Sequence, residues 1–301
     1  MNNITNQDNI KLAIKYMVFA SLLFAFTGAF AKLLSNHMSS LEVVFFRNIS
    51  GVIIISLSIY KSPLNQVGGK PLLLFFRGLI GFLALLMYFY DIAHISLAEA
   101  QTFSKTAPIF TAIFAYIFIK EKLSVQAWIG VFVGFIGILF ITKFTGSNLS
   151  KTDWLGILSG VGAGLAYTSI RELKNFYDTR AIVLSFMTVG TVGPMLLMVI
   201  GEFYTTTTFD FMIAKFVVPT GIAWFYIVGL GVTATFSQIY MTKAYMNAKG
   251  GIVGTFSYTN IIFSIAVGMM LGDSFPDMFV IFGIVLIVFS GILVSLNSKP
   301  K

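Results

Sequence analysis

The chain has 301 residues, of which 57% are hydrophobic and only 11% are charged, with a formal net charge of +8. Soluble proteins carry about twice that charged fraction, so this composition indicates a membrane protein. Lysines and arginines stand at the ends of apolar runs and form no basic face, so no nucleic-acid partner is expected. Without cysteine there are no disulfides or thiolate metal sites, and no cofactor is expected.

Ten apolar segments follow one another along the chain, each close to the length that a membrane-crossing helix needs. We therefore expect an all-α membrane protein with ten transmembrane helices embedded in the lipid bilayer. The predicted spans cover residues 13–34, 41–60, 72–92, 97–119, 125–142, 154–172, 181–200, 218–241, 251–271 and 276–296.

Positive charge in the loops predicts the orientation of these spans. With the N-terminus inside, the inner loops and termini hold thirteen lysines and arginines, and the outer loops hold three: Lys143, Lys151 and Lys215. This asymmetry predicts a multi-pass protein of the plasma (inner) membrane with both termini in the cytoplasm.

An internal repeat divides the chain into two halves, 13–142 and 154–296. Thr102-Phe103-Ser104 recurs as Thr255-Phe256-Ser257, and Thr106 and Gly130 recur as Thr259 and Gly283 at the same offset of 153 residues. Each half holds five predicted spans, so the second half enters the membrane from the opposite side. Such inverted repeats are typical of transporters that open alternately to the two faces.

The fourth span, 97–119, contains Gln101, Lys105 and Pro108 among apolar residues. A lysine at this depth is costly in lipid, so we expect it to face a watery or protein-lined interior. Lys105 either contacts an anionic group of the substrate or pairs with a buried acid, Glu99 or Asp91. Pro108 is expected to kink the helix and free backbone carbonyls beside the site.

Four further charged residues, Arg47, Arg77, Glu99 and Glu121, are candidates for structural or gating roles. Arg47 is expected to form a fixed ion pair with Glu42, Asp91 or Glu99. Arg77 and Glu121 lie near the inner face, where a gate or an interfacial anchor is expected.

Polar and aromatic residues in several spans are candidates for the lining of a central cavity. The alternative for each is plain helix packing, because aromatics make up 16% of the chain. The candidates are Tyr258, Asn260, Gln238, Tyr240, Tyr88, Tyr90, Phe26, Tyr167 and Gln101. Gly160, Gly162 and Gly164 look like a nucleotide loop, but no strand precedes them, and close helix packing is expected instead.

The chain resembles the drug/metabolite transporter superfamily, EamA type, over nearly its whole length. The residues that carry the resemblance are Phe45-Phe46-Arg47, Phe76-Arg77-Gly78, Tyr88-Phe89-Tyr90, Ala93, Pro108, Glu121, Gly130, Gly134 and Gly137. The second half departs from the pattern, with Ile261 in place of the proline. The resemblance implies two inverted five-helix repeats, with helices three, four, eight and nine beside a central cavity and helices five and ten at the periphery. It leaves the substrate open among amino acids, nucleotide-linked compounds, vitamins and drugs.

These features predict a secondary transporter that moves a small organic metabolite, anionic or zwitterionic, by alternating access. A channel or lipid scramblase is an alternative. An intramembrane enzyme is another, but the chain has only two histidines, no HExxH and no G-x-S-x-G. All acids lie at or near span ends, which favours uniport, exchange or coupling through Lys105 over a midplane acid. The oligomeric state, monomer or homodimer, stays open.

Overall fold

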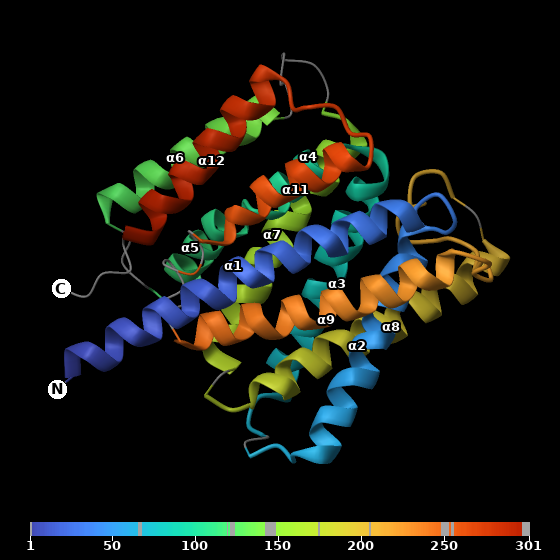
Figure 1. Cartoon of the computed structure of the whole chain (residues 1–301), viewed down its shortest axis with the longest axis horizontal. Helices are drawn as coiled ribbons and strands as arrows, with labels where there is room; N and C mark the ends of the chain where they lie inside the picture. The colour runs from blue at the N-terminus through green and yellow to red at the C-terminus, as the bar shows by residue number, and fades with distance from the viewer. Residues whose placement is uncertain are drawn as a thin grey trace.

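The computed structural model describes residues 2–65, 68–118, 120, 124–141, 149–173, 175–204, 206–247, 253 and 256–296. Side chains are described in these ranges except at 2–9, 115, 171, 245, 246 and 294–296. Glu121, one of the gating candidates, lies outside the described residues. Within these ranges the chain is built of α-helices (Figure 1).

The helices follow one another in chain order. They are α1 (Asn2–Leu34), α2 (Ser40–Lys61), α3 (Pro71–His94), α4 (Leu97–Ser104), α5 (Ala107–Phe118), α6 (Val125–Ile141), α7 (Lys151–Leu173), α8 (Thr179–Phe203), α9 (Ala223–Asn247), α11 (Thr259–Met270) and α12 (Met278–Leu296).

Helix starts follow from local hydrogen bonding at two positions. Ser39 and Glu42 form a capping box at the start of α2, and Ser96 and Glu99 form the same motif at the start of α4. Each box satisfies backbone N–H groups that no helical carbonyl can reach. Pro71 begins α3, where its missing N–H costs nothing.

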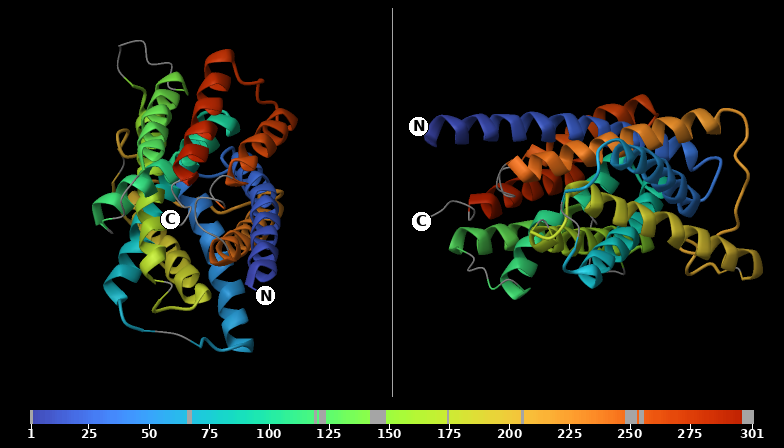
Figure 2. Two further views of the ribbon diagram at one scale, coloured as in Figure 1. Left: turned by 90° about the vertical axis from the view of Figure 1, so that its left-hand side faces the viewer. Right: turned by 90° about the horizontal axis from the view of Figure 1, so that it is seen from below.

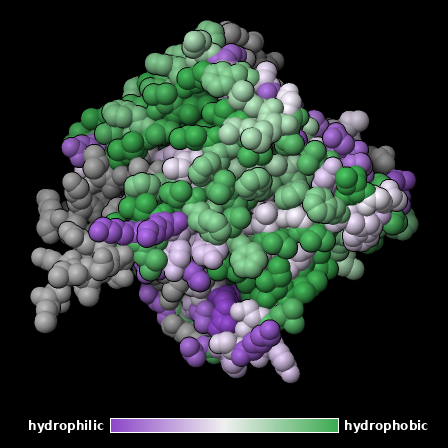
Figure 3. All heavy atoms as spheres, viewed as in Figure 1, coloured by the Kyte–Doolittle hydropathy of each residue, from purple (hydrophilic) through white to green (hydrophobic). Residues whose placement is uncertain are grey.

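The outer surface of the molecule is apolar. In the part of the chain that the structure describes, four helical segments are long and apolar enough to cross a bilayer: Ile10–Leu34, Ser40–Lys61, Pro71–His94 and Thr179–Phe203. Large hydrophobic side chains such as Ile53, Phe132 and Phe203 are exposed to the surroundings, and hydrophobic residues cover much of the face in Figure 3. A soluble protein rarely exposes apolar area on this scale, whereas a membrane protein offers it to lipid.

Helices from the two halves of the chain pack against each other in pairs. α1 packs along α9, α3 along α7, α2 along α8, and α6 along α12. Figures 1 and 2 show α1 and α9 side by side over most of their length, and α6 and α12 together at one edge of the molecule. The start of α1 and the end of α12 lie on the same side.

Small residues let these pairs approach closely. A Cβ on Gly137 of α6 would lie 3.1 Å from the Gly283 carbonyl oxygen of α12, and a Cβ on Gly283 would lie 2.9 Å from the Gly137 carbonyl oxygen. Ser290 donates a hydrogen bond of 2.6 Å to the Gly130 carbonyl. In α7, a Cβ on Gly162 would approach Ala84 of α3 to 2.9 Å. The glycines thus serve helix packing, as expected for Gly162 and its neighbours.

The expected single span 97–119 is two helices, α4 and α5, separated at Lys105 and Thr106. The Thr106 hydroxyl donates to the Phe103 carbonyl at 2.6 Å, and Pro108 lies in the first turn of α5. The proline therefore does not kink a continuous helix; it helps start a new one after a break. The second half repeats the detail: Thr259, the first residue of α11, donates to the Phe256 carbonyl at 2.7 Å.

Candidate functional site

A cavity of about 100 Å³ lies in the interior, among helices from both halves. Residues of α1, α2, α3, α4, α7, α8 and α9 form its wall, together with Lys105, which caps α4. The lining consists of Phe24, Arg47, Arg77, Gly81, Ala84, Leu85, Tyr88, Gln101, Ser104, Lys105, Ser159, Ala163, Ala166, Tyr167, Phe186, Gln238 and Met241.

The charge of this lining has one sign. Arg47, Arg77 and Lys105 come from three different segments, and no acidic residue is among the described residues of the wall. Buried cations are costly unless an anion or an acceptor offsets them. The cavity therefore favours a ligand that brings negative charge.

Arg47 is buried and reaches the cavity from α2. Its Nη1 donates to Asn48 Oδ1 at 2.8 Å, and its guanidinium carbon lies 5.5 Å from the centre of the Phe186 ring. The expected ion pair is not formed, because Glu42 accepts hydrogen bonds from Ser39 and from the Val217 amide. The charge of Arg47 is thus met by an amide and an aromatic face.

Arg77 of α3 lies near the same Phe186 ring as Arg47 and also lines the cavity. Its guanidinium carbon is 4.3 Å from the centre of the Phe186 ring, and only 2% of the residue is exposed. Its Nε and Nη1 are buried and donate to no acceptor among the described residues. Instead of an anchor at the inner face, Arg77 is a wall residue with unused donors.

Lys105 projects from the break between α4 and α5. Its Nζ lies 5.7 Å from the centre of the Phe24 ring, and it forms no ion pair with Glu99 or Asp91. Glu99 is engaged in the capping box with Ser96. One turn before Lys105, Gln101 Nε2 is also buried and has no acceptor among the described residues. This amide adds a further donor to the same wall.

Of the aromatic and polar candidates, Tyr88, Tyr167 and Gln238 are also in the wall of the cavity. They come from α3, α7 and α9, so packing of both halves brings them together. Asn260 is fully buried elsewhere, where its Nδ2 donates to the Ser21 carbonyl at 2.8 Å. Tyr258 is buried against α12, next to Gly291.

Three other candidates lie outside the described wall. Tyr240 packs edge-on against Phe19, with ring centres 5.0 Å apart. Tyr90 donates to Asp210 at 3.2 Å at the end of α3. Phe26 is partly exposed, and Phe24, two residues earlier, lines the cavity in its place.

Several wall residues carried no distinct sequence signal. Ser104, Ser159 and Phe186 lie in apolar runs that contain many similar residues. Arg47 and Arg77 did carry a sequence signal, because each stands several residues inside an apolar span, where a charged residue is costly and marks a candidate functional site.

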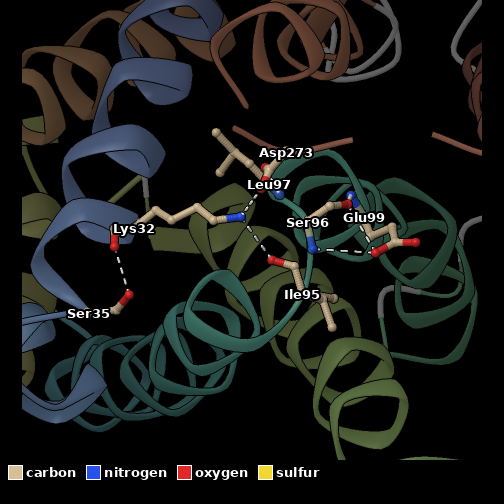
Figure 4. Close-up of polar contacts among 7 residues, drawn as sticks. All are labelled: Lys32, Ser35, Ile95, Ser96, Leu97, Glu99 and Asp273. Carbon is tan, nitrogen blue, oxygen red and sulfur yellow. Dashed lines mark hydrogen bonds and ion pairs between the residues drawn. The ribbon is translucent and has the colours of Figure 1, made fainter. Parts of the chain in front are cut away.

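A second polar cluster joins the two halves at one end of the molecule (Figure 4). Lys32, near the end of α1, forms an ion pair with Asp273 and donates to the Ile95 carbonyl at 3.3 Å. The Leu97 amide, at the start of α4, donates to Asp273 Oδ2 at 3.0 Å. Asp273 therefore ties the segment after α11 to both α1 and α4.

An all-helical protein with an apolar exterior and a buried cationic cavity is the kind of structure that membrane transporters have. The EamA-like transporter family matches residues 11–143. A transporter of Helicobacter pylori, described as uncharacterized, is 33% identical over 98% of both chains. The pseudopaline exporter CntI of Pseudomonas aeruginosa is 31% identical over 97% of this chain and 99% of its own.

The fold itself also has a match. A solved crystal structure superposes with a TM-score of 0.63 over 93% of this chain and 95% of its own, at 17% identity. The identities to full-length relatives establish that this chain belongs to the EamA-like transporter family, in the drug/metabolite transporter superfamily. It is a multi-pass membrane protein of a family of transporters.

Proposed function

We propose that this protein is a secondary transporter that moves a small organic anion by alternating access. The observation that carries the proposal is the central cavity. Arg47, Arg77 and Lys105 line it, and no acidic residue is among the described residues of its wall. The buried N–H groups of Arg77 and Gln101 have no acceptor among the described residues. A carboxylate or phosphate brings both the charge and the acceptors that this wall lacks. Arg77, Gln101 and Lys105 are the proposed first contacts.

The packing pairs support two inverted five-span repeats, 13–142 and 154–296. In this scheme α1, α2 and α3 correspond to α7, α8 and α9. Exchanging the counterparts turns the α1–α9 pair into the α7–α3 pair, and the α2–α9 pair into the α8–α3 pair; all four pairs are present. The α2–α8 and α6–α12 pairs are unchanged by the exchange, because each joins a helix to its own counterpart. A contact pattern unchanged by this exchange is what a two-fold axis in the membrane plane requires.

With both termini in the cytoplasm, as the loop charges predict, the Lys32–Asp273 cluster lies at the outer end of the fold. It joins α1 and α4 of one repeat to the segment after α11 of the other. We propose that this ion pair holds the outer side shut, so that the cavity opens outward only when it breaks. Breaking it is feasible, since both side chains are only partly buried.

Purified protein in lipid nanodiscs provides the first test. Thermal stability is measured with probe compounds of matched size: succinate, citrate, glutamate, glutamine and lysine. Ligand binding to the folded state raises the melting temperature. We expect stabilisation by anionic probes, and we expect it to fall in Arg77→Gln but not in Lys70→Gln, a surface control.

The best radiolabelled probe is then followed into proteoliposomes. A carrier shows saturable uptake and counterflow, whereas a channel shows neither. CntI is named as an exporter, so outward movement is assayed first. Stabilisation by lysine or glutamine alone, or flux that does not saturate, contradicts the proposal.

A further inference from the structure

Asp91 is a buried carboxyl that the cavity does not use. It lies on α3, one turn beyond the cavity residue Tyr88, and its exposed fraction is 0%. Neither Oδ1 nor Oδ2 accepts a hydrogen bond from any described residue. From the sequence this acid belongs to the outer end of its span; in the structure it is enclosed within the protein.

The space for this side chain is created by Gly156 of α7. A Cβ at Gly156 would lie 3.0 Å from Asp91 Oδ2 and 2.5 Å from the ring of Phe103, which is itself buried. The carboxyl thus sits between a glycine backbone and an aromatic ring. This surrounding offers no donor to stabilise a negative charge.

Among the described residues, no charged group on the neighbouring helices forms an ion pair with Asp91. Lys105, which caps α4, has its Nζ 5.7 Å from the centre of the Phe24 ring. On α1, Lys32 pairs with Asp273; on α2, Arg47 donates to Asn48. On α4, Glu99 is held by Ser96, and on α7, Lys151 pairs with Asp210.

Of the remaining titratable groups at this end of the fold, Lys215 and His37 are exposed, and the others are acids, His94 or tyrosines. Asp153 of α7 accepts from Ser150, Glu202 of α8 is exposed, and His94 of α3 stacks on Tyr90. None of them supplies positive charge to Asp91. A carboxylate buried without a partner is strongly disfavoured, so the carboxyl in this conformation is expected to be neutral and to hold its proton.

We propose that Asp91 is the proton-binding site that couples this transporter to a proton gradient. The proposal rests on the proposed transport function. In the conformation seen here Asp91 keeps its proton; when the halves move, water enters beside Tyr88 and the Asp91 Oδ–H bond breaks, with the proton passing to that water and the electron pair staying on the carboxylate. Substrate and proton then share helix α3, which carries both Arg77 and Asp91.

Infrared spectroscopy of the protein in nanodiscs tests the protonation without any substrate. At neutral pH we expect the C=O stretching band of a protonated carboxyl, lost in Asp91→Asn and retained in Glu172→Gln, an exposed control acid. Asparagine has the shape of aspartic acid, so folding should be kept. Wild-type protein labelled with ¹³C at aspartate carboxyls gives an independent assignment, because the band must shift if an aspartic acid carries it.

Proteoliposome flux tests the coupling. With the radiolabelled probe that the wild type transports, a pH gradient should drive accumulation in wild type and not in Asp91→Asn, while exchange at equal pH persists in both. If wild type lacks the protonated aspartic acid band at neutral pH, or if Asp91→Asn still responds to the gradient, the inference is wrong. Loss of all flux in wild type contradicts the transport function instead, because the infrared result does not depend on it.

Discussion

Arg77 places a positive charge in the protein interior, and two of its N–H groups, at Nε and Nη1, have no hydrogen-bond acceptor among the described residues. Its neighbour Phe186 offers a ring face, which also lies near Arg47. Cation–π contact offsets part of the cost of burial, but it leaves the N–H groups unmet. Such residues are poorly explained by stability alone and well explained by a ligand that completes them.

We therefore expect Arg77→Gln to weaken anion binding by about 10- to 100-fold, since a hydrogen bond to a charged group contributes about 1.5–3 kcal/mol. Arg77→Lys should recover part of the loss by keeping the charge without the planar pair of donors. Dissociation constants from titrated thermal shifts measure the effect. Equal affinity in Arg77→Gln and wild type would show that the guanidinium does not contact the ligand.

At the scale of helices, the proposed closure at the outer end depends on the Lys32–Asp273 cluster. Asp273 has two tasks there: it pairs with Lys32, and it accepts the Leu97 amide at the start of α4. The partly exposed ion pair with Lys32 contributes little to stability. The contact with the Leu97 amide matters more, because the first N–H groups of a helix have no acceptor within the helix. The two tasks can be separated by mutation.

Lys32→Met and Asp273→Asn should both loosen the closure, whereas Asp273→Leu should do so more strongly because it also leaves the Leu97 amide unmet. The chain has no cysteine, so Ser104→Cys places a single thiol in the cavity wall. Labelling of that thiol by a membrane-impermeant reagent from outside should become several-fold faster in the variants. Unchanged labelling rates would mean that the cluster is not a gate.

Close glycine contacts bring α6 and α12 together, and the Ser290 hydroxyl adds one hydrogen bond to the Gly130 carbonyl. Gly137→Val forces a branched side chain against the α12 backbone, and overpacking of this kind costs about 1–3 kcal/mol. We expect a lower melting temperature in detergent for Gly137→Val and little change for Phe132→Leu, whose side chain faces lipid. Similar stability of both variants would argue against close packing of this pair.

At the scale of the whole molecule, we propose that the two halves insert in opposite senses, which the exchange of helix pairs supports. Single cysteines test it: Thr208→Cys, between α8 and α9, should react with an impermeant reagent from outside intact cells. Ser62→Cys, after α2, should react only once the membrane is opened. Reaction of Ser62→Cys from outside would contradict the orientation and the inner position of the α2 end.

The sequence by itself determined the class of structure, because membrane burial demands long apolar helices and penalises charge within them. Its repeat also matched a structural detail, the break in α4–α5 and its counterpart at Thr259, since hydroxyl-to-backbone bonds are local. Lys105 could also be singled out from the sequence, because a charge well inside an apolar span is costly in lipid. Composition and local pattern are enough for such inferences.

Only the tertiary structure decided which charges meet. Arg47 and Arg77 are thirty residues apart, and their approach to one phenylalanine depends on how α2, α3 and α8 are rotated about their axes. The burial of Asp91 depends likewise on the register of α3 against Gly156 of α7, and the Lys32–Asp273 pair on that of α1 against the far end of the chain. Rotation and register are set by side-chain packing between distant segments, and no local pattern in one segment contains them.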